Sequence, residues 1–166
     1  NAKDYVNINA SNKFSWETAN GLGINDSAMI LKPVSEWYID NLQKVSKIAP
    51  VLEYDIRVTQ GGKANLTLLA VPSFPVIQGK KLRCAISIDG RSPQWVNFRM
   101  GKSNGRLWEK SVAKNIMKGK IQTNLKSGRH TLQVLGTDPS INLSKIVFDF
   151  GGIKNSYLGP PSTLVK

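Results

Sequence analysis

Cysteine and histidine are scarce in this chain, which limits the chemistry that it can perform. Its 166 residues include one cysteine, Cys84, and one histidine, His130. A lone cysteine forms no internal disulfide, and zinc sites need several Cys or His ligands at regular spacing. Cys84 lies in an apolar alternation, so we expect a buried thiol. His130 stands at a predicted strand start and is expected to satisfy a local hydrogen bond. We therefore predict no metal site.

Carboxylates are also few, with 11 Asp and Glu residues in total. A glycosidase needs two carboxyl groups about 5–10 Å apart across its sugar, and no spacing here marks such a pair. Glu53 and Asp55 would share one face of a strand, where they are interpreted as solvent-facing polar residues. Asp89 and Asp138 precede a glycine and a proline, which is typical of turns. We predict no catalytic residue in this chain.

Long apolar runs are absent, whereas positive charge is abundant. No run approaches the roughly 20 residues that span a membrane, so we expect no membrane partner. The net charge is +12, from 23 Lys and Arg residues. Such charge favours nucleic acid or an acidic polymer, but the lysines are scattered and form no Arg-rich block. The stretch 99–129 is denser, and it is interpreted either as a solvated surface or as a face that attracts a polyanion.

Strand periodicity dominates the rest of the sequence. Apolar and polar residues alternate in period two between Gly, Pro, Asn and Asp turn signals. We expect strands at residues 5–10, 27–31, 51–58, 64–71, 82–88, 94–99, 121–125, 131–135 and 145–150. The Gly61-Gly62 pair predicts a hairpin joining 51–58 to 64–71. The last two strands are expected to flank a tight turn at Asp138-Pro139.

Helix signals are weaker. Residues 36–48 place Tyr38, Leu42 and Val45 on one face, with Ser35 as a candidate cap. Residues 108–117 fit either a helix or a strand. About nine strands with frequent turns predict an all-β fold, an antiparallel β-sandwich or jelly roll with at most one or two short helices.

Sugar recognition needs flat apolar faces and a few polar groups for hydroxyls. The candidates for the apolar faces are Trp16, Trp37 and Trp95, although core packing is an alternative for each. Trp37 and Trp95 are the least strand-like and are expected to be more exposed. The planar guanidinium groups of Arg91 and Arg99 could pair with a uronate carboxylate.

Several motifs resemble a known family in their order along the chain. They are Leu52-Glu53-Tyr54-Asp55, Asp138-Pro139, Gly151-Gly152 and, most specifically, Tyr157-Leu158-Gly159-Pro160-Pro161. From about Tyr5 to Leu164 the chain resembles the C-terminal domain of glycoside hydrolase family 115, the xylan α-glucuronidases. The resemblance implies a galactose-binding-like β-sandwich, related to carbohydrate-binding modules, that leaves catalysis to another domain.

The resemblance also implies the molecular setting. We expect residues 1–2 to be the remnant of an expression tag and residues 3–166 to be one β-sandwich domain excised from a larger hydrolase. The implied parent removes glucuronic acid or its 4-O-methyl form from xylan and is secreted or periplasmic. The implied partners are the parent's catalytic domain, xylan or another acidic polysaccharide, and a second copy of the chain.

Related sandwiches carry a Glu-Ala-Glu strand that helps to hold a structural calcium ion. The equivalent stretch here is Ile8-Asn9-Ala10-Ser11, in which both acidic positions are neutral. Calcium prefers several charged oxygen ligands, so we expect no cofactor. Two other functions stay open at this point: a purely structural dimerisation module, and a basic nucleic-acid-binding domain.

Overall fold

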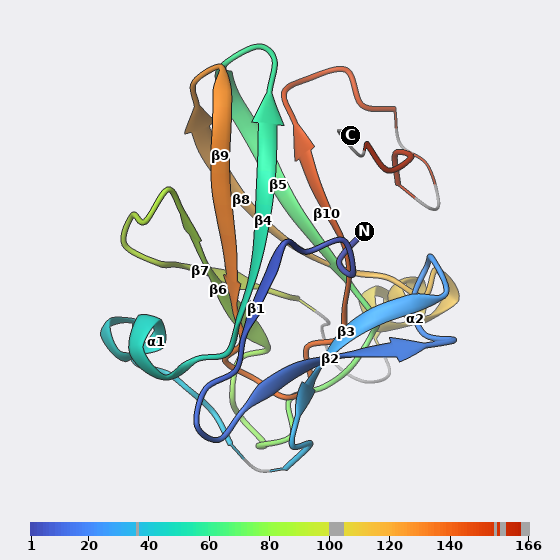
Figure 1. Ribbon diagram of the computed structural model, residues 1–166. Helices are drawn as coiled ribbons and strands as arrows, with labels where there is room; N and C mark the ends of the chain where they lie inside the picture. The colour runs from blue at the N-terminus through green and yellow to red at the C-terminus, as the bar shows by residue number, and fades with distance from the viewer. Residues whose placement is uncertain (36, 100–104, 155, 157–158, 164–166) are drawn as a thin grey trace.

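The computed structural model describes residues 1–35, 37–99, 105–154, 156 and 159–163. Its strands form two five-stranded sheets packed face to face (Figure 1). Sheet A contains, in spatial order, β1 (Asn7–Asn9), β4 (Val51–Val58), β9 (Gly128–Leu135), β6 (Arg83–Ile88) and β7 (Gln94–Asn97). Sheet B contains β2 (Ser15–Asn20), β3 (Ser27–Lys32), β10 (Leu143–Asp149), β5 (Gly62–Ala70) and β8 (Met117–Leu125). The described pairings are antiparallel, so the predicted antiparallel β-sandwich is confirmed.

The core lies between the sheets and follows the period-two pattern. In β4, Leu52 and Tyr54 are buried and Asp55 is exposed. Leu66 of β5 joins the same apolar cluster from the opposite sheet. Removing this apolar surface from water is the main favourable term in folding. Cys84 of β6 is also buried there, as predicted, and desolvation raises the pKa of its thiol above the usual range.

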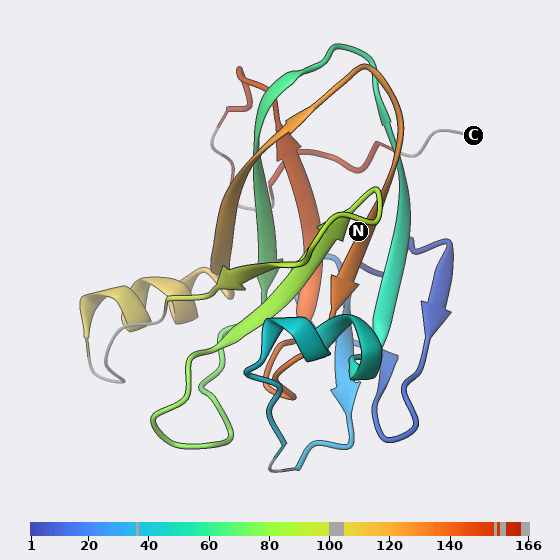
Figure 2. The ribbon, with the colours of Figure 1, turned by 90° about the vertical axis from the view of Figure 1, so that its left-hand side faces the viewer.

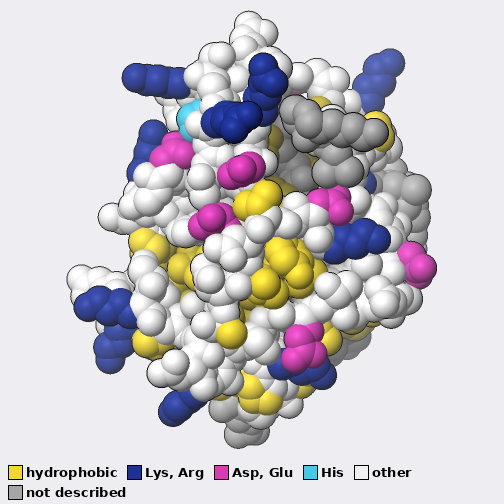
Figure 3. Space-filling model, viewed as in Figure 1, with side chains coloured by type: hydrophobic (Ala, Val, Ile, Leu, Met, Phe, Trp, Pro, Cys, Tyr) yellow, Lys and Arg dark blue, Asp and Glu magenta, His cyan; other side chains and the backbone are white. Residues whose placement is uncertain are grey.

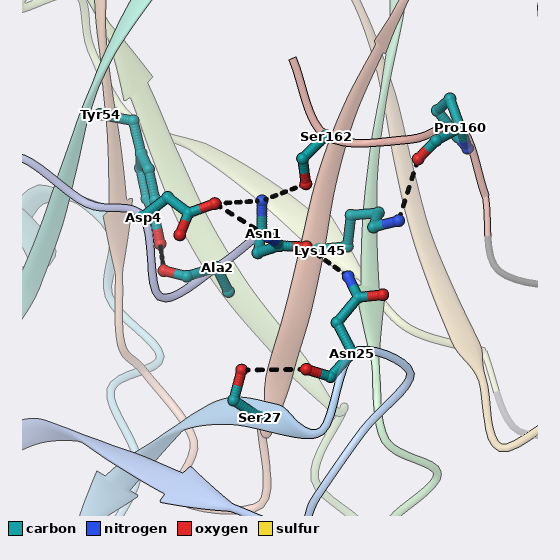
Figure 4. A network of polar contacts seen from close by, with 9 residues as sticks. All are labelled: Asn1, Ala2, Asp4, Asn25, Ser27, Tyr54, Lys145, Pro160 and Ser162. Carbon is teal, nitrogen blue, oxygen red and sulfur yellow. Dashed lines mark hydrogen bonds and ion pairs between the residues drawn. The ribbon is translucent and has the colours of Figure 1, made fainter. Parts of the chain in front are cut away.

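The first residues of the chain are part of the fold (Figure 4). Ala2 is fully buried. Its N–H donates to the Ser144 carbonyl at 2.9 Å, and its carbonyl accepts from the Tyr54 hydroxyl at 2.6 Å. The side-chain amide of Asn25 donates to the side-chain oxygen of Asn1. Ala2 thus satisfies the hydroxyl of a buried tyrosine, and residues 1–2 contribute contacts to the sandwich.

The closing tail covers the outer side of β10. The Lys145 ammonium group donates to the Pro160 carbonyl at 3.0 Å (Figure 4), and burial lowers the pKa of this lysine. Gly159 takes a left-handed φ of 70°, which glycine adopts without strain. The tail is therefore fastened to sheet B. Tyr157 and Leu158, the start of the most specific family motif, lie outside the described residues.

The predicted hairpin between residues 51–58 and 64–71 is wrong, because β4 belongs to sheet A and β5 to sheet B. The connection crosses the sandwich beside the similar β8–β9 connection, and the Ser127 hydroxyl donates to the Thr59 carbonyl at 3.1 Å. A Cβ atom on Gly61 would lie 2.9 Å from the Leu125 carbonyl oxygen. Glycine at this position thus permits two crossings to run close together.

The closing strands also lie in different sheets, β9 in sheet A and β10 in sheet B. They flank the turn at Asp138-Pro139 as predicted, but they do not pair with each other. The turn itself is present: the Asp138 carboxylate accepts from the Ser140 N–H at 2.8 Å. Asp138 is buried, and desolvation raises the pKa of its carboxyl group despite that hydrogen bond. The motif bends the chain from one sheet to the other.

Both helices are short. Helix α1 (Leu42–Ile48) begins after Asn41, whose side chain accepts from the Gln43 N–H at 2.9 Å. The predicted cap at Ser35 is wrong, because the helix begins only after Asn41 and the Ile39 N–H donates to the Thr137 carbonyl. The predicted first helical residue, Glu36, lies outside the described residues.

Helix α2 (Arg106–Ala113) resolves the ambiguous stretch 108–117, since the helix ends before β8 begins at Met117. The sequence analysis missed β2. Its only buried residue is Trp16, so the edge strand has almost no period-two signal.

Candidate functional site

Trp16 is part of the core. It is 2% exposed, and its indole N–H donates to the Pro50 carbonyl at 3.1 Å. Both the ring and its polar atom are thus used within the domain. Trp16 has no free face for a sugar ring, so its core alternative is correct.

Trp37 is buried as well, at 9% exposure. Its ring stacks on Phe14 with a centroid separation of 4.0 Å, and its indole N–H donates to the Pro33 carbonyl at 2.8 Å. The expectation that Trp37 would be exposed is therefore wrong. An irregular segment does not imply an exposed side chain, because this segment folds back against sheet A.

Trp95 is half-buried, and one of its faces is occupied. The Arg83 guanidinium carbon lies 3.6 Å from the centre of the Trp95 ring and 5.3 Å from that of Tyr38. An Arg83 nitrogen also donates to the Asp40 carbonyl at 3.2 Å. A cation held against aromatic faces is stabilised by their quadrupoles. Trp95 thus helps to fasten residues 38–40 to sheet A.

Arg91 is exposed in the turn after β6. Its N–H donates to the Ile88 carbonyl at 3.1 Å, and its carbonyl accepts from the Ser87 hydroxyl at 2.6 Å. Nearby, the Nδ1 atom of His130 lies 2.8 Å from the Asp89 carboxylate. The turn positions these groups, but they face neither of the hollows described below.

His130 has the local hydrogen bonds expected of it. Besides the contact with Asp89, its Nε2 atom lies 2.9 Å from the Lys126 carbonyl. These two bonds raise the pKa of His130. Desolvation acts to raise the pKa of Asp89, but hydrogen bonds from His130 and from the Thr131 N–H lower it overall. The group links the β6 turn to the start of β9.

Arg99 lines the larger of two hollows. This hollow, here called the basic hollow, has a volume of about 430 Å³. Its lining consists of Phe74, Pro75, Lys80, Lys81, Leu82, Asn97, Phe98 and Arg99. It lies between the 71–82 loop and the end of β7. Among the five predicted site residues, only Arg99 lines it.

The basic hollow has one exposed aromatic wall. Phe74 is 40% exposed and stacks on Trp108 of α2 with a centroid separation of 4.3 Å. Phe74 was not among the predicted site residues. The available signal was an aromatic residue with a proline two positions before it and another directly after it. Prolines limit the ways in which a loop can bury such a ring.

Hydrogen bonds and an ion pair hold the floor and one side of the basic hollow. Leu82 and Phe98 are buried, and the Phe98 N–H donates to the Leu82 carbonyl at 2.9 Å. The Tyr38 hydroxyl donates to the Lys81 carbonyl at 2.8 Å, and Lys80 pairs with Asp40 at 3.2 Å. These contacts join the 71–82 loop to residues 38–40 before α1, and Figure 2 shows both segments at the lower end of the sandwich.

A second hollow of about 380 Å³ is lined by Ser11, Lys13, Phe14, Ser15, Glu17, Lys32 and Pro33. It combines a carboxylate with two lysines, and the ring of Phe14 is already stacked on Trp37. Its charge is therefore mixed. Among its described lining residues, the basic hollow has three cationic side chains and no carboxylate.

Charge is dispersed on the face of the molecule that includes the N-terminal strands β1 and β2 (Figure 3). On the face drawn in Figure 3, most Lys and Arg side chains lie toward the edges, with acidic and hydrophobic side chains between them. Within the described ranges, no three His, Cys, Asp or Glu side chains gather closely enough to hold a metal ion. The described helices include none long and apolar enough to cross a membrane.

Two face-to-face antiparallel sheets of five strands each define the chain as a β-sandwich domain. A model of the glycosyl hydrolase family 115 C-terminal domain matches residues 1–162, and the chain therefore belongs to that family. It is an accessory domain of these hydrolases, as predicted from its closing motifs. No curated protein matches the chain.

Solved structures share the fold. One is a family GH115 4-O-methyl-alpha-glucuronidase with specificity for decorated arabinogalactans, with a TM-score of 0.63 and 20% identity over 90% of this chain and 18% of that one. Another is a family 35 carbohydrate-binding module from Clostridium thermocellum, with a TM-score of 0.54 and 12% identity over 87% of this chain and 91% of that one. This chain thus spans less than a fifth of the glucuronidase.

Proposed function

We propose that this domain contacts polysaccharide for a larger family 115 hydrolase that removes glucuronic acid groups from glucuronoxylan. The observation that carries the proposal is the basic hollow, in which an exposed aromatic ring stands beside cationic side chains. Family membership supports it, because the matching model describes the C-terminal domain of a hydrolase. We also propose that the parent protein acts in the periplasm or the extracellular space, because its proposed substrate is a polymer.

The chemistry of the basic hollow suits a sugar ring. Ligand pockets of roughly 300–1,000 Å³ combine apolar walls with a few well-placed polar groups, and this hollow falls within that range. The face of Phe74 can contact sugar C–H groups, and the exposed Asn97 amide can bond to hydroxyls. The buried side chains of Leu82 and Phe98 give the hollow an apolar floor.

Affinity electrophoresis tests the proposal. The chain is run in native gels that contain glucuronoxylan, arabinogalactan or no polysaccharide. We expect glucuronoxylan to retard the wild-type chain and Phe74→Ala to lose most of the retardation. Phe150→Ala is the matched control, because Phe150 is also 40% exposed but follows β10. Unretarded wild-type protein, or equal losses in both variants, would contradict the proposal.

A second function, packing on the parent's catalytic domain, is supported by α2. Leu107 and Val112 are 48% and 49% exposed on this short helix. The related glucuronidase extends far beyond this domain, so another domain of the parent could cover α2. A second copy of the chain is a poorer partner, because it would bring another +12 of charge. We expect the chain alone to sediment as a monomer. A dimer that Val112→Lys dissociates would instead assign α2 to self-association.

A further inference from the structure

The basic hollow contains cations that the protein itself leaves available. Lys81 and Arg99 are both exposed, and neither forms an ion pair within the part of the chain that the structure describes. Lys81 stands on the 71–82 loop, whereas Arg99 follows β7. The two charges therefore approach the hollow from separate segments.

Lys80 differs from its neighbour. Its ammonium group lies 3.2 Å from the Asp40 carboxylate and 5.1 Å from the centre of the Tyr38 ring. These contacts direct Lys80 toward the segment before α1 and partly neutralise it. Of the two adjacent lysines, one thus fastens the loop and the other supplies charge to the hollow.

The backbone anchors both available cations. The Lys81 carbonyl accepts a hydrogen bond from the Tyr38 hydroxyl, and the carbonyl of the next residue, Leu82, accepts one from the Phe98 N–H. Phe98 precedes Arg99, is 5% exposed and forms a bridge with Gly119 of β8. Only the side chains beyond these anchored positions must be ordered when a ligand binds, which limits the entropic cost of binding.

We infer that the ligand of the basic hollow is a sugar that carries a carboxylate, a hexuronic acid residue. The inference rests on the proposed function and specifies in addition that the bound sugar is negatively charged. Arg99 offers a planar fork of donors to a carboxylate, and Lys81 offers a point charge. Phe74 contributes the apolar face that distinguishes a uronate from a simple anion. The second hollow, with Glu17 among its lining residues, lacks this preference.

Carboxyl reduction of glucuronoxylan gives the matched ligand, because it converts uronic acid residues to neutral sugars and leaves the backbone intact. Titration calorimetry at 150 mM salt compares the two polymers. We expect the reduced polymer to bind about tenfold more weakly, as loss of a charge-assisted hydrogen bond predicts. Equal affinities would overturn the inference and leave the proposed function standing. No binding to either polymer would overturn the proposed function and the inference with it.

Variants separate a defined site from general charge attraction. Lys81→Gln and Arg99→Gln should each weaken binding of the acidic polymer several-fold and leave binding of the reduced polymer unchanged. Lys63→Gln and Arg57→Gln remove the same charges from exposed positions on β5 and β4, and we expect little change. Equal weakening by both sets would overturn the inference.

Small ligands test whether the sugar matters as well as the charge. In NMR titrations, glucuronate should shift the backbone amide signals of Leu82 and Phe98 more than acetate or methyl glucoside at the same concentration. Acetate shifts of equal size would reduce the hollow to an anion site and overturn the inference.

Discussion

Two aromatic pairs in this domain have nearly the same geometry and opposite surroundings. Phe14 and Trp37 stack with centroids 4.0 Å apart and ring planes at 22°, and Phe74 and Trp108 stack at 4.3 Å and 28°. The first pair holds a tryptophan that is 9% exposed and hydrogen-bonded to the backbone. In the second pair, Phe74 is 40% exposed and lines the basic hollow.

The difference shows that ring type does not decide whether an aromatic residue serves packing or binding. Trp37 lies in a segment tied to sheet A at several points, so its large surface is buried there. Phe74 lies in a loop whose prolines and anchored end hold it at the surface. The polar neighbours complete the distinction, since an exposed ring without Lys81 and Arg99 would be one more surface hydrophobe.

The largest expected effect concerns the buried pair. Trp37→Ala should lower the free energy of unfolding by about 3 kcal/mol or more, because it leaves a cavity and frees the Pro33 carbonyl. Urea unfolding followed by circular dichroism measures this. Protein that remains folded should still bind glucuronoxylan. A stable variant that had lost binding would reverse the roles of the two pairs.

A smaller loss of stability is expected from the exposed pair. Trp108→Ala should cost about 1–2 kcal/mol, since an aromatic contact of this kind contributes roughly 0.5–1.5 kcal/mol beyond the area that it buries. It should also weaken polysaccharide binding, because Phe74 loses the ring that orients it. The same unfolding and calorimetric measurements apply. Unchanged affinity would mean that the loop alone positions Phe74.

Alternation predicted most of the fold, because burial on one face of a strand leaves a period-two trace. It located β4, β5 and β9 well, but it assigned β4 and β5 to one hairpin. Period two reports which side of a strand is buried and carries no information about its partner. The pairing depends on the close passage of two crossings at Gly61, which the sequence shows only as a turn signal.

The candidate site was less predictable. Arg99 was chosen because its planar guanidinium group could pair with a uronate, and it lines the basic hollow. Trp16 and Trp37 were chosen for their flat rings and are buried. Lys81 could not be told from Lys80 by sequence. The structure distinguishes them by the position of Asp40, which forms an ion pair with Lys80.

The smallest expected effect concerns the pH dependence of stability that His130 causes at the β8–β9 end. It tests whether binding at the basic hollow is independent of that end. Bonds to Asp89 and Lys126 raise the pKa of His130 above its ordinary value of about 6.5. Protonated His130 thus stabilises the fold below that ordinary value, and this contribution is lost as pH rises through the higher folded-state pKa. For this exposed pair the loss between pH 6 and 8 should stay below about 1 kcal/mol.

His130→Gln should flatten that pH dependence of stability, as measured by urea unfolding at several pH values. Glucuronoxylan affinity should stay constant over the same range, because His130 is not among the described residues that line the basic hollow. Affinity that fell together with stability would show that the two ends are coupled. The basic hollow would then have to share a conformational change with the β6 turn, and the anchoring of Lys81 and Phe98 would not be enough to hold it.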